Sequence, residues 1–206
     1  MTRLVALTGA GISVASGLPT YTDESREKFA GGQTIEQMYE LYWNDLAGWL
    51  DAKPNAAHLA LAEHAVKVIT QNIDDLHRKA GSTELVELHG NLREFYCPRC
   101  LQRVEAAPRR GEYLTCPRDG ERLRPNIVFY GESVHGLDEA MEWVVTADHL
   151  LVIGTSLLVS PAANLAGLAQ YRRVPVTVID QAAETEVPRL LRKLGKPRIA
   201  ERGATL

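Results

Sequence analysis

The sequence predicts an α/β protein with a parallel sheet and helices on both faces. Short apolar runs that favour strands alternate with longer stretches whose apolar residues recur at helical spacing. Glycine or polar residues directly follow several predicted strands, as at Thr8-Gly9 and Gly154-Thr155. This alternation is typical of βαβ units, in which helices join parallel strands and cover the sheet.

The composition is that of an ordinary globular protein. Of the 206 residues, 45% are hydrophobic and 24% charged, and the net charge of −3 gives no overall attraction to nucleic acid or membranes. No stretch has the roughly 18 apolar residues of a membrane span, and the N-terminus lacks a signal-peptide pattern. The 3 cysteines are clustered, which argues against a disulfide framework and predicts a reducing, cytoplasmic location. Nothing marks a large apolar interface, so we expect a monomer.

The first predicted strand leads into a candidate phosphate-binding turn. Leu4–Leu7 is a short apolar run, and Thr8–Gly11 connects it to a helix that opens at Ile12. Free backbone N–H groups and the helix dipole would point at an anion above this turn. The Gly-x-Gly-x-x-Gly fingerprint of dehydrogenases does not fit, because Val14 occupies its third glycine position. Gly-x-Gly alone fits a tight strand–helix turn without a ligand about equally well.

The chain between residues 18 and 90 continues the alternation. Residues 18–33 are polar and predict a mobile loop, and Thr34–Leu50 has near-helical spacing with aromatic residues that favour a core role. The next predicted elements are a helix over Ala56–Ala65 capped by Asn55, a strand over Val66–Thr70, a helix over Leu76–Ala80 and a strand over Leu85–Leu88. Gln71–Asp74 and His89-Gly90 follow two of these strands, where open parallel sheets bind ligands.

An insert over Arg93–Arg124 interrupts the alternation, and the sheet is expected to resume after it. The insert is rich in arginine, but neighbouring acidic residues offset most of that charge. The later predicted elements are a strand over Ile127–Tyr130, a helix over Leu137–Val145, a strand over His149–Ile153, a helix over Pro161–Tyr171, a strand over Val174–Ile179 and a helix over Val187–Leu194.

The insert also carries a candidate zinc site. Its two tight turns each present two ligand side chains, Cys97 with Cys100 and Cys116 with Asp119. This spacing is typical of tetrahedral zinc, and a carboxylate oxygen is an acceptable fourth ligand. Four protein ligands leave no open position, so the predicted zinc is structural. The alternative is a pair of turns that has lost its metal and is held by packing.

A set of short motifs, in this order along the chain, resembles the sirtuins, the NAD-dependent protein deacylases. The motifs are Gly9–Ser13, Thr70–Asp74, His89-Gly90, the cysteine pairs, Arg124-Pro125, Gly131-Glu132 and Gly154–Ser156. The resemblance covers about residues 4–194. It implies a Rossmann-like NAD-binding domain formed by residues 1–20, 52–91 and 125–206. It also implies a small helical and zinc-ribbon domain formed by residues 21–51 and 92–124.

The resemblance implies that NAD and an acyl-lysine peptide meet in the cleft between these domains. Positions implied to hold NAD are Gly9, Ala10, Gly11, Ser13, Pro19, Thr20, Tyr21, Gln71, Asn72, Ile73, Asp74, Gly154, Thr155, Ser156, Asp180 and Ala183. Positions implied to contact the peptide or its acyl group are Val128, Phe129, Gly131, Glu132 and Leu158. His89 and Asn72 are the implied catalytic residues. Histidine suits the general base that activates a ribose hydroxyl, because its pKa of about 6.5 lies near working pH.

Several positions depart from the family pattern. Thr22 replaces an arginine that many sirtuins have, which predicts weaker NAD binding or slower turnover, whereas Asp180 replaces an asparagine and can still accept from ribose hydroxyls. Sirtuins that remove dicarboxylic acyl groups have tyrosine and arginine three residues apart. Here Tyr42 matches the tyrosine, but Asp45 stands where the arginine would be. We therefore expect acetyl or other uncharged acyl groups rather than succinyl.

Three other functions remain open from the sequence. ADP-ribosyl transfer to protein, or NAD hydrolysis, would use the same pocket, although His89 favours deacylation. Thr22 and Asp119 are the arguments for a non-catalytic NAD-binding module. The arginine-rich insert is the argument for a nucleic-acid-binding zinc module, but the insert has no series of aromatic residues for base stacking.

Overall fold

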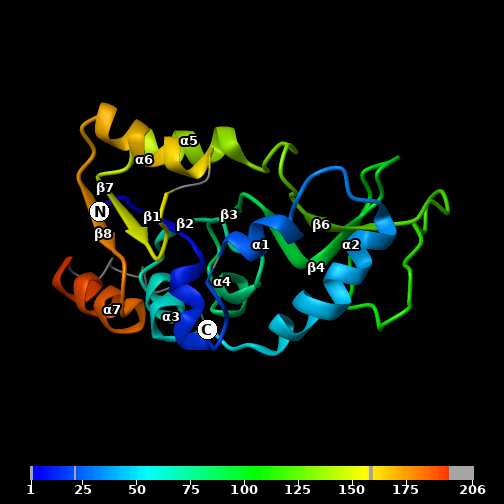
Figure 1. Ribbon diagram of the computed structural model, residues 1–206. Helices are drawn as coiled ribbons and strands as arrows, with labels where there is room; N and C mark the ends of the chain where they lie inside the picture. Colours follow the sequence, from blue (N-terminus) through cyan, green and yellow to red (C-terminus); the bar gives the residue numbers. More distant parts are fainter. Residues whose placement is uncertain (1, 21, 158–159, 195–206) are drawn as a thin grey trace, which may run out of the picture.

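The computed structural model describes residues 2–20, 22–157 and 160–194 and contains two sheets (Figure 1). Elements of the larger sheet and its cover are β1 (Leu4–Thr8), η1 (Ala10–Ser16), α3 (Ala56–Glu63), β2 (Lys67–Thr70), α4 (Leu76–Lys79), β3 (Leu85–Glu87), α5 (Leu137–Thr146), β7 (His149–Ile153), α6 (Ala162–Tyr171), β8 (Val176–Ile179) and α7 (Ala183–Leu194). The other elements are α1 (Asp23–Lys28), α2 (Ile35–Leu41), η2 (Tyr42–Leu46), η3 (Ala47–Asp51), β4 (Gly90–Tyr96), β5 (Arg103–Glu105) and β6 (Arg124–Ile127). None of the helices in these ranges has the length and apolar character needed to cross a bilayer.

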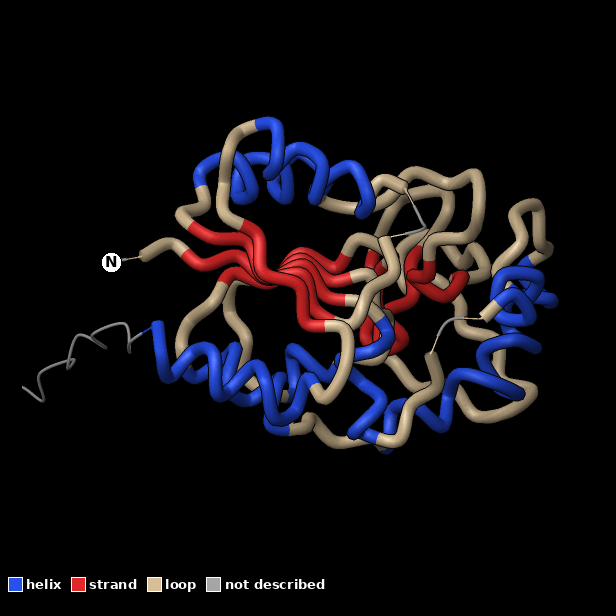
Figure 2. Tube along the Cα trace, turned by 60° about the vertical axis from the view of Figure 1, so that its left-hand side comes forward, coloured by secondary structure: helices blue, strands red, loops and turns tan. Residues whose placement is uncertain are grey.

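The larger sheet confirms the predicted α/β fold. Its strands are parallel in the order β3-β2-β1-β7-β8, and helices cover both of its faces (Figure 2). Alternate residues of β1 and β7 face opposite layers, so that Leu7 packs in one core with α5 and α6, while Ala6 packs in another with α3 and α7. Strands buried on both faces need continuous apolar runs, which is why these strands were visible in the sequence.

The smaller sheet is antiparallel, in the order β5-β4-β6, and it corrects the prediction for Ile127–Tyr130. This segment does not rejoin the large sheet, because β6 ends at Ile127 and pairs with β4. The next residues bridge separate elements instead: the Val128 N–H donates to the His89 carbonyl and the Tyr130 N–H to the Phe29 carbonyl, each at 3.0 Å. An apolar run thus faces a cleft without being a strand of the large sheet.

The segment before α3 also differs from the prediction. A short helix, α1, lies in the region expected to be a mobile loop. The single helix expected over Thr34–Leu50 is divided into α2, η2 and η3, which have α, π and 3₁₀ geometry. Thr34 and Gln37 form a capping box that starts α2. The π turn changes the helical period, and such turns are frequent near functional sites.

Smaller boundary differences occur near the C-terminus. The strand expected from Val174 begins at Val176, and the closing helix expected from Val187 begins four residues earlier at Ala183. The cap at Asn55 is confirmed, since its Oδ1 accepts from the Ala57 N–H at 2.9 Å. The same side chain also donates to the Ile12 carbonyl at 2.7 Å, which joins α3 to η1.

The α2–η3 segment packs with the smaller sheet around an aromatic core. Tyr39 and Tyr42 contact Phe95 of β4, with ring centroids 5.7 and 5.2 Å apart. The Tyr39 hydroxyl accepts from the Leu114 N–H at 3.1 Å, which ties α2 to the cysteine-bearing loops. These contacts join residues from both halves of the small domain that the resemblance implies, while the domain boundaries themselves stay a prediction.

Two buried histidines lie side by side beneath the large sheet. The rings of His58 on α3 and His77 on α4 have centroids 4.8 Å apart, and both side chains are almost fully buried. His58 Nδ1 accepts from the Asn55 N–H, but His58 Nε2 and His77 Nδ1 have no partner among the described residues. Burial lowers the pKa of His58 to about 4 and that of His77 well below its usual value.

Acid should therefore weaken the fold through this pair. Both rings stay neutral in the folded chain, whereas in the unfolded chain they bind protons below about pH 6.5. The contribution of the two rings to the free energy of unfolding is constant above that pH and becomes destabilising toward pH 4. His58 alone should lower the free energy of unfolding by roughly 2 kcal/mol at pH 5. Urea unfolding should show that His58→Gln, which keeps an acceptor for the Asn55 N–H but cannot titrate, loses less stability between pH 7 and 5. Equal losses in variant and wild type would contradict this explanation.

Candidate active site

Two glycine turns interlock at the carboxyl ends of β1 and β7. The Gly9 N–H donates to the Ile153 carbonyl at 3.0 Å, and the Gly11 N–H donates to the Gly154 carbonyl at 2.8 Å. A Cβ on Gly11 would lie 2.6 Å from the Gly154 Cα, and one on Gly154 would lie 2.3 Å from the Ile12 nitrogen. Gly154 also has a φ of +58°, in the left-handed region. Only glycine fits at these two positions.

This packing corrects the predicted set of free N–H groups at the turn. The N–H groups of Gly9 and Gly11 are used between the two turns, and the Ile12 N–H donates to the Gly9 carbonyl at 3.1 Å. The helix that follows, η1, is 3₁₀ and ends at Gly17. The turn is therefore a thin, closely packed floor that leaves space above it, rather than an open row of donors.

A polar cluster stands beside this floor at the end of β2. Asp74 accepts from the Ser13 hydroxyl at 2.7 Å and, through its other oxygen, from the Leu76 N–H at 3.0 Å. The Asn72 Nδ2 lies 3.1 Å from both the Ser13 Oγ and the Asp74 Oδ2. Burial raises the pKa of the Asp74 carboxyl, although these hydrogen bonds oppose the rise. The cluster fixes one carboxyl and one amide group in a largely desolvated place.

His89 lines the same cavity as this cluster and lies two residues after the end of β3. Its Nδ1 is 2.8 Å from the Gln71 carbonyl oxygen, which can only accept, so Nδ1 carries the proton in the neutral ring. Burial lowers the pKa of His89, and nearby His135 acts in the same direction. The imidazole is therefore neutral at pH 7 and has Nε2 free to accept a proton. Gly90 is required next, since a Cβ there would lie 1.9 Å from the Asn126 carbonyl oxygen.

A single cavity of about 470 Å³ brings most of the predicted site together. Predicted residues that line it are Gly9, Ala10, Gly11, Ser13, Pro19, Thr20, Gln71, Asn72, Ile73, Asp74, His89, Val128, Phe129, Gly131, Glu132, Gly154, Thr155, Ser156 and Asp180. Tyr21 and Leu158 lie outside the described residues. Ala183 is not part of the lining, because it is buried at the start of α7 against the core that contains Ile12.

The cavity wall near Phe129 is shaped by an ion pair. Arg124 donates to both carboxylate oxygens of Glu132, at 2.7 and 3.0 Å, and Glu132 also accepts from the Phe129 N–H at 3.0 Å. These bonds show that the Glu132 carboxylate holds the turn that presents Phe129, while the predicted contact between Glu132 and substrate stays a prediction. The Arg124 pairing lowers the pKa of Glu132, although burial opposes this.

Sequence reasoning missed several apolar residues of the lining. Phe29 and Trp49 face the cavity from the segment predicted as a loop and from the end of η3, and Leu18, Ile127 and Val134 contribute further surface. Trp49 had been assigned to the core with the other aromatic residues of its segment. No local pattern distinguishes an aromatic side chain at a cavity from one in a core, because the difference depends on distant residues.

The described lining is acidic and apolar. It contains Asp74, Glu132 and Asp180 but neither arginine nor lysine. Asp45, from which the preference for uncharged acyl groups was predicted, does not line this cavity and pairs with Lys28 at 2.5 Å, while the preference itself stays a prediction. Tyr42 is also outside it, since its side chain is fully buried and burial raises its pKa to about 12.

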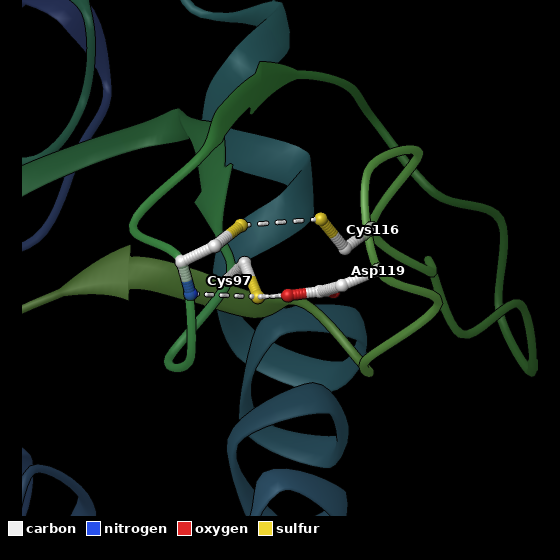
Figure 3. Close-up of side chains that lie close together, drawn as sticks. Cys97, Cys116 and Asp119 are labelled. Carbon is white, nitrogen blue, oxygen red and sulfur yellow. Dashed lines mark hydrogen bonds between the residues drawn. The ribbon is translucent and has the colours of Figure 1, made fainter.

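A second cluster gathers the predicted metal ligands (Figure 3). The ligand atoms of Cys97, Cys100, Cys116 and Asp119 all lie within 4.8 Å of one another. Cys97 Sγ is 3.5 Å from the Asp119 carboxylate oxygens, and Cys100 Sγ is 3.6 Å from Cys116 Sγ. The predicted turn pair thus converges on one point, and it does so at the edge of the aromatic core.

The donor set of this cluster fits zinc. Three thiols and one carboxylate are ligands that zinc accepts in a tetrahedral site. The N–H groups of Cys100 and Arg118 point at the sulfur atoms of Cys97 and Cys116, each at 3.4 Å, and such donors stabilise thiolates. Asp119 is exposed and is oriented by the Glu121 N–H at 3.0 Å. With four protein ligands, this arrangement can support a structural ion, remote from the cavity.

Comparisons with known proteins find relatives in one family. A model of the Sir2 family matches residues 9–161. NAD-dependent protein deacylase 1 of Caldanaerobacter subterraneus subsp. tengcongensis is 41% identical over 192 residues, covering 82% of this chain and 78% of that protein. A solved Sir2 homolog–NAD complex has a TM-score of 0.78 at 32% identity and covers 93% of this chain and 88% of that one. A Sir2 structure with an acetylated peptide has a TM-score of 0.80 at 31% identity, covering 93% of both chains.

Zinc content tests the fourth ligand. We expect about one zinc per chain in wild-type protein, retention in Asp119→Cys, and loss on mild EDTA dialysis in Asp119→Ala. Loss of the ion should lower the thermal midpoint, because it leaves two loops without a cross-link. Asp51→Ala, which removes an exposed carboxylate at the end of η3, is the control. Metal analysis after dialysis is the measurement, and full retention in Asp119→Ala would remove Asp119 from the ligand set.

Proposed function

The chain belongs to the Sir2 family, and from that membership and the cavity we propose that it is an NAD-dependent protein-lysine deacylase. NAD is consumed as co-substrate, and the products are nicotinamide, the free lysine side chain and O-acyl-ADP-ribose. The observation that carries the proposal is the placement of His89, with Nε2 free, in the same cavity as Asn72 and Asp74. The fold alone would not be sufficient, because function resides in sites.

We propose that the parts of NAD lie at different strand ends of the cavity. The pyrophosphate would lie above the glycine floor, where the absence of side chains at Gly9 and Gly11 allows close approach. Nicotinamide would lie at Asn72–Asp74, and the adenosine half at Gly154–Ser156 and Asp180. The described lining offers no cation for the phosphates, which supports the weaker NAD binding expected from Thr22.

The residues of the nicotinamide end orient departure of the leaving group. When bound, NAD supplies a sugar carbon that becomes electrophilic as the bond to nicotinamide breaks. The Asn72–Asp74 cluster is held by internal hydrogen bonds, so it can orient a carboxamide without reorganising. The apolar surface of Phe29, Ile73 and Phe129 excludes water, and this favours the acyl oxygen over water as the attacking group.

His89 acts as the general base for a ribose hydroxyl. Its Nε2 takes the proton, and the charge that develops on the ring is stabilised by the Nδ1–H bond to the Gln71 carbonyl. Gln71 is itself positioned by donation from its Nε2 to the Thr155 hydroxyl at 2.8 Å. Burial lowers the pKa of His89, which keeps its ring in the basic form at neutral pH. ADP-ribosyl transfer and NAD hydrolysis would not require this base, and they remain the alternative outcomes.

The acyl-lysine would enter between the wall at Val128–Gly131 and the segment near Leu157. Backbone pairing with an extended peptide is a common mode of recognition at such edges. We also propose that the protein acts as a monomer in the cytoplasm, where reduced Cys97, Cys100 and Cys116 can bind zinc. The acidic and apolar lining of the cavity does not favour nucleic acid as a ligand.

His89→Ala tests the reaction. Incubated with an acetyl-lysine peptide and NAD, wild type should yield nicotinamide, free lysine and O-acetyl-ADP-ribose by mass spectrometry. The rate of lysine deacylation should fall by about 10²- to 10⁴-fold in the variant, because the base is removed. NAD affinity should be unchanged, because the binding surface is kept. His149→Gln, outside the cavity, is the control. Because burial lowers the pKa of His89, wild-type activity should fall only below about pH 6.5. Nicotinamide release without lysine release would favour ADP-ribosyl transfer or hydrolysis.

Acyl preference tests the charge of the lining. On one peptide sequence, acetyl and butyryl groups should be removed from lysine at least about tenfold faster than a succinyl group. The reason is that the described lining holds carboxylates and no cation, so a succinyl carboxylate would be desolvated and unpaired. Butyryl is the matched control, since it has the chain length of succinyl without its charge. A faster rate with succinyl-lysine would contradict the proposed preference.

A further inference from the structure

The polar segment that follows β2 is held from the smaller sheet. The Ile73 carbonyl accepts from the Leu92 N–H of β4 at 2.9 Å. Asp75, which starts α4, accepts from the Arg93 Nε at 2.6 Å and from the Asn91 Nδ2 at 3.1 Å. Three consecutive residues of β4 therefore contact the loop that contains Asp74. The cavity side of this loop faces nicotinamide in the proposed function, and the opposite side faces β4.

Asp75 adopts an unusual conformation for these contacts. Its φ is +66°, a left-handed value at which glycine is unstrained and aspartate is tolerated. Its side chain is only 4% exposed, whereas that of Arg93 is 47% exposed. A buried carboxylate needs a charged or hydrogen-bonded partner, and here Arg93 and Asn91 provide both. The Asn91 amide also donates to Glu87 at 2.6 Å, and Glu87 pairs with Arg78.

The charge of Asp75 affects its neighbour as well. Asp75 lies next to Asp74 and acts to raise the pKa of the Asp74 carboxyl. The Arg93 guanidinium offsets this negative charge from the far side of the loop. Removal of Arg93 would leave a buried carboxylate with no cation, and with only the Asn91 amide as partner from β4, immediately beside Asp74, and the loop would rearrange to hydrate it. The geometry of Asp74 in the cavity thus depends on a pair of residues that do not line it.

We propose that Asp75 and Arg93 are positioning residues, which hold Asp74 against the nicotinamide end of NAD through the contacts between β4 and the loop that precedes α4. The inference rests on the proposed function. It differs from a purely structural role in one respect: the pair should affect only ligands that carry nicotinamide. ADP-ribose has the same pyrophosphate and adenosine as NAD but lacks the group that Asp74 would face.

Calorimetric titration with NAD and with ADP-ribose tests this selectivity. In Arg93→Met, which keeps an apolar stem, we expect the Kd for NAD to rise about tenfold, as for loss of one charge-assisted hydrogen bond. The Kd for ADP-ribose should change by less than about twofold, and nicotinamide inhibition should weaken in parallel with NAD binding. Asp75→Gly should behave in the same way, because glycine keeps the φ of +66° while removing the tether.

Controls separate positioning from stability. Arg3→Met breaks an exposed ion pair with Asp148. It should leave the Kd for NAD, the Kd for ADP-ribose and the inhibition by nicotinamide unchanged. Asp75→Asn retains an oxygen acceptor and should lie between wild type and Asp75→Gly. The double variant Asp75→Gly/Arg93→Met should lose no more NAD affinity than either single variant, since both remove one contact.

The outcomes are distinct for the inference and for the proposed function. Equal losses of NAD and ADP-ribose affinity, or a lower thermal midpoint with both affinities unchanged, would show a structural role and overturn the inference. If wild-type protein releases no nicotinamide from NAD in the presence of an acetyl-lysine peptide, the proposed function fails first. Selective loss of NAD affinity in the two single variants supports the positioning role.

Discussion

The approach of the Gly11 backbone to Gly154 is the constraint on which the cavity depends. It brings the ends of β1 and β7 together, and it forms a floor without side chains across the centre of the parallel sheet. The hydrogen bonds that hold it use the N–H groups of Gly9 and Gly11, so an anion there would be bound by shape and by the remaining polar groups. The floor of the cavity is thus formed by close backbone packing and not by charged side chains.

A buried hydrogen-bond series supports the polar side of this floor. His77 Nε2 lies 3.0 Å from the Thr8 hydroxyl, which donates to the Thr70 hydroxyl at 2.8 Å, and that hydroxyl accepts from the Asn72 N–H at 3.1 Å. Asn72 in turn contacts Asp74. Although His77 Nδ1 has no partner, the Thr8 and Thr70 hydroxyls and the Asn72 N–H are all paired, and breaking one of these bonds in a low-dielectric interior would leave a group unpaired. The uncharged residues below the sheet end thus help to fix the position of Asn72 at the cavity.

Local sequence patterns predicted the parts of this structure that local forces determine. The sequence predicts β1, β7 and α5 because the spacing of their apolar residues matches the faces that they bury. Ile127–Tyr130 has the same appearance as a buried strand, yet its N–H groups pair with His89 and Phe29, which are distant in sequence. The use of the Gly9 and Gly11 N–H groups, the position of Trp49 and the distance between Asp45 and the cavity likewise depend on long-range contacts. The lining at His89 and Asp74 was predicted by the order of the motifs along the chain and their resemblance to one family, since each motif alone also fits an ordinary turn.

The strand β4 connects the two sites of the molecule. One end follows His89 at Gly90, and the other reaches Tyr96, directly before the ligand Cys97. Seven residues in extended conformation span roughly 23 Å, so β4 alone crosses from the cavity to the cysteine cluster. Phe95 fixes it in the aromatic core, while Arg93 and Asn91 fix it to Asp75. An ion that closes the two cysteine turns would cross-link the loops at the far end of this three-stranded sheet. A structural zinc would therefore act on the reaction from a distance, by keeping β4 straight enough to hold the loop that carries Asp74.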